Sequence, residues 1–213
     1  MRLYLSSFLI GDWPERFVEL IAPGKRVALI LNALDHRQAI RDKFLASQTE
    51  TLTALGLEVE ELDLRKYFDR SEELGALLQE KDAVWINGGN TFLLRRAMKQ
   101  SGFDRLIKDL LEKDEIVYGG FSAGVVILPP SLKGLEIVDD PIEVSEGYEP
   151  EALWDGLGLI DFAVAVHYDS DHPESALMDD EIEYYRKHNI PYKTLRDGEV
   201  IIKNGDSLEL LSK

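Results

Sequence analysis

The sequence contains no cysteine, and this absence removes several kinds of chemistry. Disulfides, thiolate metal sites and a cysteine nucleophile are all excluded. No apolar run approaches the ~18 residues of a membrane-spanning helix. The first residues, 1–8, also lack the long apolar segment and small-residue cleavage site of a signal peptide. We therefore expect a cytoplasmic protein with no membrane partner.

Basic residues are comparatively few, with 24 Lys and Arg against 40 Asp and Glu, which gives a net charge of −16. Binding to nucleic-acid phosphates needs a clustered basic surface, so a nucleic-acid partner is not expected. The acidity is interpreted as a solubility feature. Hydrophobic residues make up 45% and charged residues 30% of the 213 residues, which is typical of a globular protein. We expect one domain spanning residues 1–213.

Apolar runs of strand length alternate with longer segments of helical period, which predicts an α/β fold with a mainly parallel sheet. Asp12 is expected to cap the first helix, and Ser71 to begin a capping box on the third. The connection 129–158 is unusually long, and such connections are often functional. The predicted elements are strands at 2–8, 26–31, 57–64, 83–86, 116–119 and 162–166, helices at 13–21, 37–55, 71–79, 91–99, 103–112 and 173–188, and a C-terminal β-hairpin at 199–211.

The motif Gly120-Phe121-Ser122-Ala123-Gly124 lies between a predicted strand and an apolar segment that continues as helix. A sharp strand-to-helix turn holds its apex residue in a strained conformation with the side chain projecting outward. We expect the glycines two residues before and after the apex to relieve crowding between them. Ser122 is therefore the candidate nucleophile, and the N–H of Ala123 the candidate oxyanion donor.

A second glycine-rich turn, Asn87-Gly88-Gly89-Asn90-Thr91, follows another predicted strand. Ligand sites in open α/β sheets form beyond the carboxyl ends of the strands, where both turns are expected. Glycine lets the backbone approach a substrate closely, so the Gly89 N–H is the second candidate oxyanion donor. Asn90 is expected to cap the next helix, and this role is compatible with a place in the site.

A serine hydroxyl needs a base to take its proton, and the chain has four histidines. His167 ends the apolar run 162–166, which would place it at the same edge of the sheet as Ser122. His172 is the alternative base. His36 lies at a loop-to-helix junction, and His188 in the last turn of a helix suggests a structural role.

The histidine needs an acidic group to hold its tautomer, and spacing does not select one. Asp140, in the long connection between Ser122 and His167, is the first candidate, followed by Asp139 and Glu174. His167 and His172 could also bind a metal with Asp169 and Asp171, but this spacing is not a standard zinc arrangement. We expect no metal and no cofactor.

The two glycine motifs in this order, followed by a histidine at a strand end, resemble the peptidase E family of serine peptidases. The resemblance spans most of the chain and implies a three-layer α/β/α fold similar to class I glutamine amidotransferases. It also implies hydrolysis of dipeptides with an N-terminal aspartate. The family's serine maps to Ser122, its histidine to His167, and its acidic member to Asp140 with a possible slip to Asp139. An aspartyl pocket would need a specific Arg or Lys.

Other functions remain open at this point. An esterase of α/β-hydrolase type would use the same Ser, acid, His order, and a flavodoxin-like binding module could keep the turns without the chemistry. An amidotransferase would need the cysteine that the chain lacks. The leading hypothesis is a serine dipeptidase with a small peptide as its substrate and a homodimer as a candidate assembly.

Overall fold

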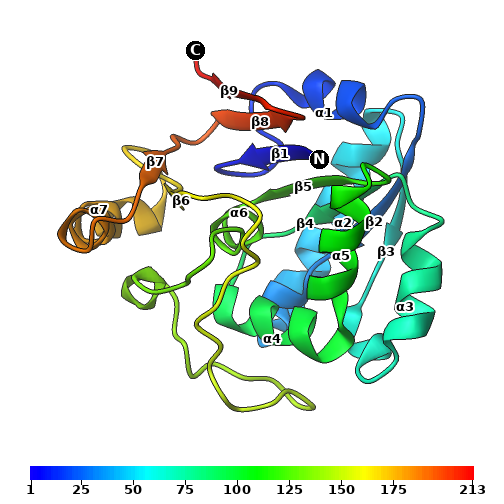
Figure 1. The fold of residues 1–213 in the computed structure, drawn as a ribbon, viewed down its shortest axis with the longest axis horizontal. Helices are drawn as coiled ribbons and strands as arrows, with labels where there is room; N and C mark the ends of the chain where they lie inside the picture. Colours follow the sequence, from blue (N-terminus) through cyan, green and yellow to red (C-terminus); the bar gives the residue numbers. More distant parts are fainter.

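A computed structural model describes all residues 1–213, and a seven-stranded sheet forms its centre (Figure 1). The first five strands in spatial order run parallel, and the last two continue the sheet antiparallel. In that order the strands are β3 (Glu58–Glu61), β2 (Arg26–Ile30), β4 (Ala83–Ile86), β5 (Val117–Phe121), β1 (Arg2–Ser6), β8 (Val200–Asn204) and β9 (Ser207–Leu211).

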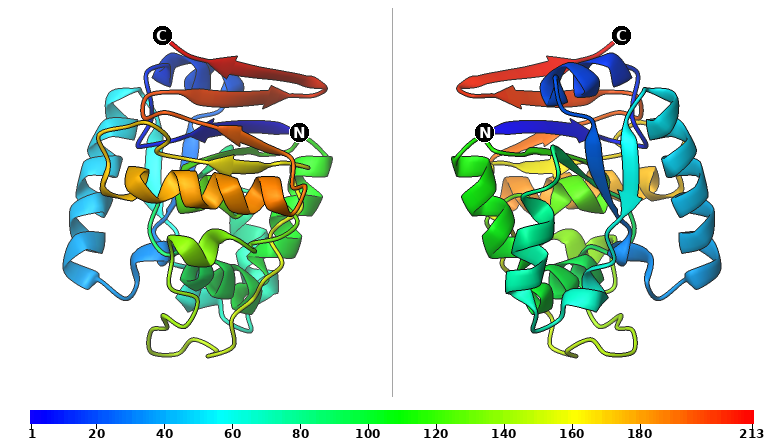
Figure 2. Two further views of the ribbon diagram at one scale, coloured as in Figure 1. Left: turned by 90° about the vertical axis from the view of Figure 1, so that its left-hand side faces the viewer. Right: turned by 90° about the vertical axis from the view of Figure 1, so that its right-hand side faces the viewer.

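Helices cover both faces of this sheet (Figure 2). The helices α1 (Pro14–Ile21) and α2 (Gln38–Ala54) pack on one face, and α3 (Ser71–Leu78), α4 (Thr91–Ser101) and α5 (Phe103–Glu112) pack on the other. Successive side chains of a strand point to opposite faces of the sheet, so each strand contributes to the hydrophobic core on both faces. In β4, Trp85 packs on the side of α1 and α2, while Val84 and Ile86 pack on the opposite side. The predicted three-layer α/β/α architecture is confirmed.

A second, two-stranded parallel sheet stands beside the main one, made of β6 (Ala163–Ala165) and β7 (Tyr192–Thr194). The helix α7 (Met178–Lys187) lies between them in the chain, and Figure 1 shows these three elements grouped apart from the main sheet. The expectation that 162–166 ends at an edge of the main sheet is therefore wrong. The strand β8 pairs with the free side of β1, so no position remains there for β6.

Short helical turns connect the larger elements. They are the four-residue α6 (Ala123–Val126) and the 3₁₀ helices η1 (Asn32–Leu34), η2 (Leu64–Tyr67), η3 (Leu135–Ile137) and η4 (Pro173–Leu177).

Two capping predictions are wrong. Trp13 occupies the N-cap position of α1 and no side chain caps that helix, because Pro14 takes the first helical position and leaves Asp12 outside. Arg70 is the N-cap of α3, so Ser71 is already helical and cannot form a capping box. The strand β3 lies at one edge of the main sheet.

Two buried cations hold the long connection 129–158: Arg95, which donates to the carbonyl and the carboxylate of Asp155, and its neighbour Arg96. Arg96 on α4 is 1% exposed, and burial lowers the pKa of its guanidinium. Its N–H groups donate to backbone carbonyls on both halves of the connection, so the segment is held against α4 although it has little regular structure. The accepting carbonyls belong to Pro141, Glu143, Pro150 and Glu151.

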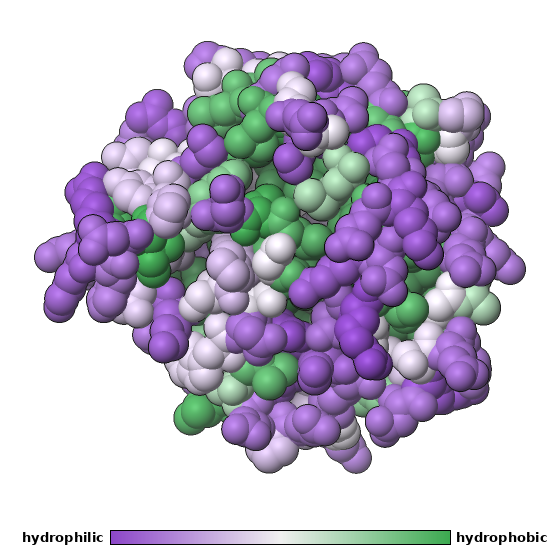
Figure 3. Space-filling model, viewed as in Figure 1, coloured by the Kyte–Doolittle hydropathy of each residue, from purple (hydrophilic) through white to green (hydrophobic).

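None of the helices combines the length and the apolar character needed to cross a bilayer. Figure 3 shows hydrophilic residues over most of one face, with hydrophobic side chains visible mainly in its middle.

Candidate active site

The site forms where three parallel strands end. Register places Ser6 of β1 opposite Phe121 of β5, and Ile86 of β4 opposite Gly120. The residues that follow these strand ends are therefore neighbours, and they include the two glycine turns expected from the sequence. This is the edge at which open α/β sheets bind ligands.

Ser122 occupies the apex of the turn from β5 into α6. Its φ of 49° and ψ of −117° are strained for a residue with a side chain, as expected for a nucleophile on a sharp turn. A Cβ on Gly120 or Gly124 would lie 2.8 Å or 2.6 Å from the Ile86 carbonyl oxygen of β4, and one on Gly120 would also lie 3.5 Å from the Gly124 carbonyl carbon. The predicted glycine requirement holds, and the tightest contacts are with the neighbouring strand.

Two backbone N–H groups beside Ser122 are free to bind an oxyanion. The N–H groups of Ala123 and Gly89 donate no hydrogen bond within the protein. The glycine turn lies directly against the serine, since a Cβ on Gly88 would be 2.9 Å from Ser122 Cβ. Gly89 has a φ of 138°, which favours glycine, and a Cβ there would meet the Ala33 carbonyl at 2.6 Å.

Asn90 keeps this turn in place. Its Oδ1 accepts a hydrogen bond from the Leu93 N–H at 2.8 Å and so caps α4, as predicted. Its Nδ2 donates to the Asp140 carbonyl at 2.9 Å, which ties the turn to the long connection. Asn90 thus supports the site and does not supply a reacting group.

His167 lies two residues beyond β6 and is 1% exposed. Its Nδ1 is 2.7 Å from Asp197 Oδ1. A carboxylate can only accept, so the proton belongs on Nδ1 and the lone pair on Nε2. Nε2 is buried without a hydrogen-bond partner, and Ser122 Oγ makes no hydrogen bond either. Burial lowers the pKa of His167, and the hydrogen bond that the ring donates to Asp197 acts in the opposite direction.

Ser7, directly after β1, links the two candidate catalytic residues. Its backbone carbonyl accepts the Ser122 N–H at 3.2 Å, and its Oγ accepts the His167 backbone N–H at 2.8 Å. The same Oγ lies 2.8 Å from Asp197 Oδ1, to which it can donate. Ser7 was not among the residues predicted from the sequence. Its position immediately after a buried strand at the ligand edge was the available signal.

The remaining histidines separate into different roles. His172 stacks on His167 with ring centroids 3.7 Å apart, and its Nδ1 accepts the Glu174 N–H. His188 is exposed at the end of α7 and contacts the Tyr184 carbonyl, in line with a structural role. Burial lowers the pKa of His36, whose Nδ1 has no partner.

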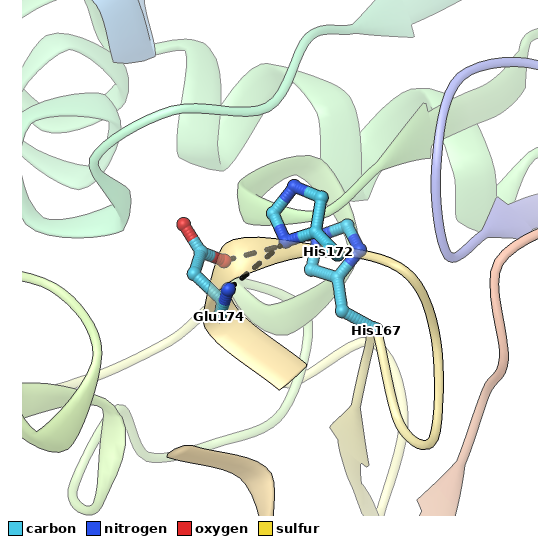
Figure 4. A group of neighbouring side chains, drawn as sticks. All are labelled: His167, His172 and Glu174. Carbon is cyan, nitrogen blue, oxygen red and sulfur yellow. Dashed lines mark hydrogen bonds and ion pairs between the residues drawn. The ribbon is translucent and has the colours of Figure 1, made fainter. Parts of the chain in front are cut away.

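One group of side chains could hold a divalent metal. Ligand atoms of His167, His172 and Glu174 all lie within 4.8 Å of one another, and Figure 4 shows the two rings stacked with the Glu174 side chain beside them. Asp169 and Asp171, the acidic partners considered from the sequence, are not in this group. A metal there would use His167 Nε2, the same atom that would accept a proton from Ser122.

Ser122 opens onto a small cavity of about 20 Å³. Its polar side chains come from α4, the Ser122 turn, the long connection, η4 and α7, and the other side chains are apolar. The lining residues are Gly89, Thr91, Ser122, Val126, Leu135, Val138, Asp139, Val166, Glu174, Met178 and Glu181. A wider hollow of about 510 Å³ lies around the Arg26–Asp82 ion pair at the opposite ends of the strands and contains none of the candidate catalytic residues.

Comparison with known proteins identifies the family. The model of "Peptidase family S51" matches residues 12–211. The chain belongs to peptidase family S51. An uncharacterized peptidase of Listeria innocua, Lin0382, is 31% identical over 147 residues, covering 69% of this chain and 66% of the relative. Peptidase E of Streptomyces coelicolor is 30% identical over 190 residues, covering 86% of this chain and 70% of the relative.

A solved structure agrees with this family assignment. The crystal structure of a candidate peptidase E protein from Listeria monocytogenes superposes with a TM-score of 0.82 at 26% identity, covering 99% of this chain and 97% of that one. The resemblance to the peptidase E family predicted from the two glycine motifs is confirmed.

The acidic partner of the histidine in this S51 chain differs from the one expected. Asp140 is not brought to His167: its carboxylate accepts the Ile142 N–H at 2.9 Å. Asp139 instead accepts the Thr91 N–H at 2.8 Å. Asp197 takes the expected position, because the parallel pairing of β6 and β7 brings it beside the ring.

Proposed function

We propose that this S51 protein is a serine peptidase that hydrolyses small peptides through an acyl-enzyme on Ser122. The observation that supports it most is the histidine, whose Nδ1 is held by Asp197 and whose buried Nε2 has no partner. A neutral imidazole in this tautomer has a free lone pair on Nε2, with which it can act as a general base. The serine at a strained apex, tied to the same Ser7, is the group it would activate.

In the proposed acylation step, Ser122 Oγ attacks the scissile carbonyl carbon and passes its proton to His167 Nε2. The Asp197 carboxylate stabilises the imidazolium that forms, and the Ala123 and Gly89 N–H groups bind the oxyanion. Each such donor typically contributes ~3 kcal/mol to lowering the barrier. The C–N bond then breaks, and the leaving amine takes the proton from Nε2.

In deacylation, His167 Nε2 takes a proton from water, whose oxygen attacks the acyl carbon. The ester bond to Ser122 breaks, the serine oxygen recovers the proton, and the free acid leaves. The lowered pKa of His167 suits this cycle. Burial keeps the imidazole neutral, so that it can accept a proton near pH 7.

Dipeptides with an N-terminal aspartate are the substrates that the peptidase E resemblance implies. The cavity at Ser122 supplies no Arg or Lys for such a side chain, so we extend the proposal to small peptides generally. The aspartyl preference stays a prediction, to be measured against other residues.

The test is a panel of Asp-Xaa, Glu-Xaa and Asn-Xaa dipeptides, with basic and neutral residues added at the first position. Peptide cleavage is followed by mass spectrometry for the parent and for Ser122→Ala. The proposal expects cleavage by the parent and a loss of about 10⁴-fold or more in Ser122→Ala, whose melting temperature should not change. Equal cleavage by the two proteins would overturn it, and far faster turnover of short p-nitrophenyl esters would favour the esterase.

A further inference from the structure

The cavity beside Ser122 has an unusual polar lining for its size. Three carboxylates, those of Asp139, Glu174 and Glu181, contribute to a space of about 20 Å³, and no Lys, Arg or His lines it. Glu181 is 2% exposed, so its charge is almost fully removed from solvent. Buried charges are normally paired, and a group of acids without a counter-ion needs an explanation.

The three carboxylates accept few hydrogen bonds from other groups of the protein. Glu181 accepts one hydrogen bond, from the Tyr185 hydroxyl, and Asp139 accepts one, from the Thr91 N–H. Glu174 accepts none, and its nearest cationic candidate is His167 Nε2 at 3.8 Å. Each carboxylate therefore has an oxygen available to accept from a ligand.

A fully buried hydroxyl completes the lining. Thr91 is 0% exposed, and its Oγ1 has no hydrogen-bond partner. This residue belongs to the first turn of α4, a different element from η4, α7 and the long connection, which carry the acidic groups. A buried polar atom without a partner at a cavity wall indicates that a ligand or water normally meets it.

The electrostatics of the cavity favour a cationic ligand. Burial, together with the neighbouring acids, raises the pKa of Asp139 to about 6 and that of Glu181 to about 7. Asp139 is partly exposed as a residue, but the protein around its carboxylate produces this shift. Arg37 is the cation that opposes it, and Arg37 does not line the cavity. A positive charge inside the cavity would favour the ionised form of all three carboxylates.

We propose that this cavity binds a protonated amino group of the substrate, held by Asp139, Glu174 and Glu181 beside the scissile bond at Ser122. An ammonium group has three N–H donors and no acceptor, which matches a lining of acceptors. The inference rests on the proposed peptidase function and sharpens it. The preferred peptides carry a cation next to the bond that is cut, and an aspartyl side chain at this point would meet like charges.

The volume of about 20 Å³ is close to the space needed by one small polar group. The ammonium could be the α-amino group of the first residue or the tip of a lysine side chain. Both sources share the same recognition chemistry, and acetylation of one or the other amine separates them.

The experiment measures peptide binding to Ser122→Ala by isothermal titration, so that turnover does not interfere. The probes are Lys-Ala, norleucyl-Ala, Nα-acetyl-Lys-Ala, Nα-acetyl-norleucyl-Ala and Nα-acetyl-Asp-Ala. We expect Lys-Ala to bind at least about tenfold more tightly than Nα-acetyl-norleucyl-Ala, which has no amino group. Retained affinity of norleucyl-Ala identifies the α-amino group, and retained affinity of Nα-acetyl-Lys-Ala identifies the side chain.

Charge-removing variants provide the matched comparison. Asp139→Asn with Glu181→Gln should weaken Lys-Ala binding about tenfold and leave Nα-acetyl-norleucyl-Ala unchanged. Glu183→Gln, on the exposed side of the same helix α7, should change neither. Melting curves check that each variant is folded.

The inference is overturned if Nα-acetyl-norleucyl-Ala binds within about twofold of Lys-Ala, if the paired variants leave Lys-Ala binding unchanged, or if Nα-acetyl-Asp-Ala binds most tightly. Cleavage of Lys-Ala by the parent protein is measured separately. Loss of cleavage with intact cation-dependent binding contradicts the peptidase function alone. Cleavage that depends on Ser122 without cation-dependent binding contradicts this inference alone.

Discussion

His167 and Asp197 face each other across the ends of two parallel strands, with Nδ1 2.7 Å from Oδ1. The register pairs Ala165 with Thr194, so the histidine follows its strand by two residues and the aspartate follows its strand by three. Hydrogen bonds continue this pairing beyond the strands, from the Tyr168 N–H to the Leu195 carbonyl. The contact is therefore fixed by backbone and not by flexible side chains alone.

Replacing Asp197 with asparagine should lower kcat by about 10⁴-fold, because the amide can stabilise the wrong tautomer of His167 and cannot stabilise its imidazolium. The measurement is steady-state cleavage of the best peptide found for the parent. Asp140→Asn is the matched control and should stay within about threefold of the parent, since Asp140 does not contact the ring. A larger loss in Asp140→Asn than in Asp197→Asn would contradict the assignment.

The pH dependence of cleavage follows from the lowered pKa of His167. The base acts in its neutral form, so kcat/KM should rise with pH through the His167 pKa and level off above it. Because burial lowers this pKa below its usual value, the half-maximal point should fall below pH 6.5. A profile of kcat/KM from about pH 4 to 9 tests this. A half-maximal point well above pH 7 would mean that another group is the base.

Ser7→Ala should reduce kcat about tenfold while KM changes little, because Ser7 positions His167 and Ser122 without touching substrate. Loss of its Oγ leaves the buried His167 N–H without an acceptor, which costs about 1–3 kcal/mol in unfolding free energy. Ser6→Ala is the control, since Ser6 is the equally buried residue that precedes Ser7, and its hydroxyl donates only to the Phe8 carbonyl. A shifted pH profile in Ser7→Ala, and not in Ser6→Ala, separates positioning from general destabilisation.

Gly88→Ala should abolish measurable cleavage, because its Cβ would lie 2.9 Å from Ser122 Cβ and would displace the serine or the oxyanion turn. Gly75→Ala on α3 is a useful comparison: its Cβ would meet only the flexible Leu106 side chain at 3.3 Å. We expect full activity there, and a gain of about 0.5–1 kcal/mol from helix propensity if Leu106 adjusts. Cleavage by Gly88→Ala at the parent's rate would show that this turn lies outside the site.

Local patterns in the sequence were sufficient for much of the architecture. The bounds of β4 and α5 match the predicted 83–86 and 103–112, because a buried apolar run and an amphipathic period mark them directly. The residues that cap the helices were harder to predict from the sequence. Ser71 has the composition of an N-cap, yet Arg70 takes that position, and only the path of the preceding turn decides between them.

The site was predictable only where one segment carries the signal. The turn at Ser122 has a local motif, whereas the acid on His167 is chosen by the pairing of two short strands 27 or more residues apart. The family resemblance placed that acid before the histidine in the chain, at Asp140. A carboxylate directly after the next short strand, at Asp197, was the signal available in the sequence. The acidic cavity likewise combines residues from five separate stretches of the chain, 89–91, 122–126, 135–139, 166 and 174–181.

The account depends on Ser122 as a nucleophile activated by His167, and covalent labelling tests this most directly. A serine-directed phosphonate is added to the parent, to Ser122→Ala and to His167→Ala, and the modified peptide is located by mass spectrometry. We predict one phosphonyl group on Ser122 in the parent, none in Ser122→Ala and at least about 100-fold slower labelling in His167→Ala. Labelling at another residue, or equal labelling of the parent and Ser122→Ala, would contradict the account.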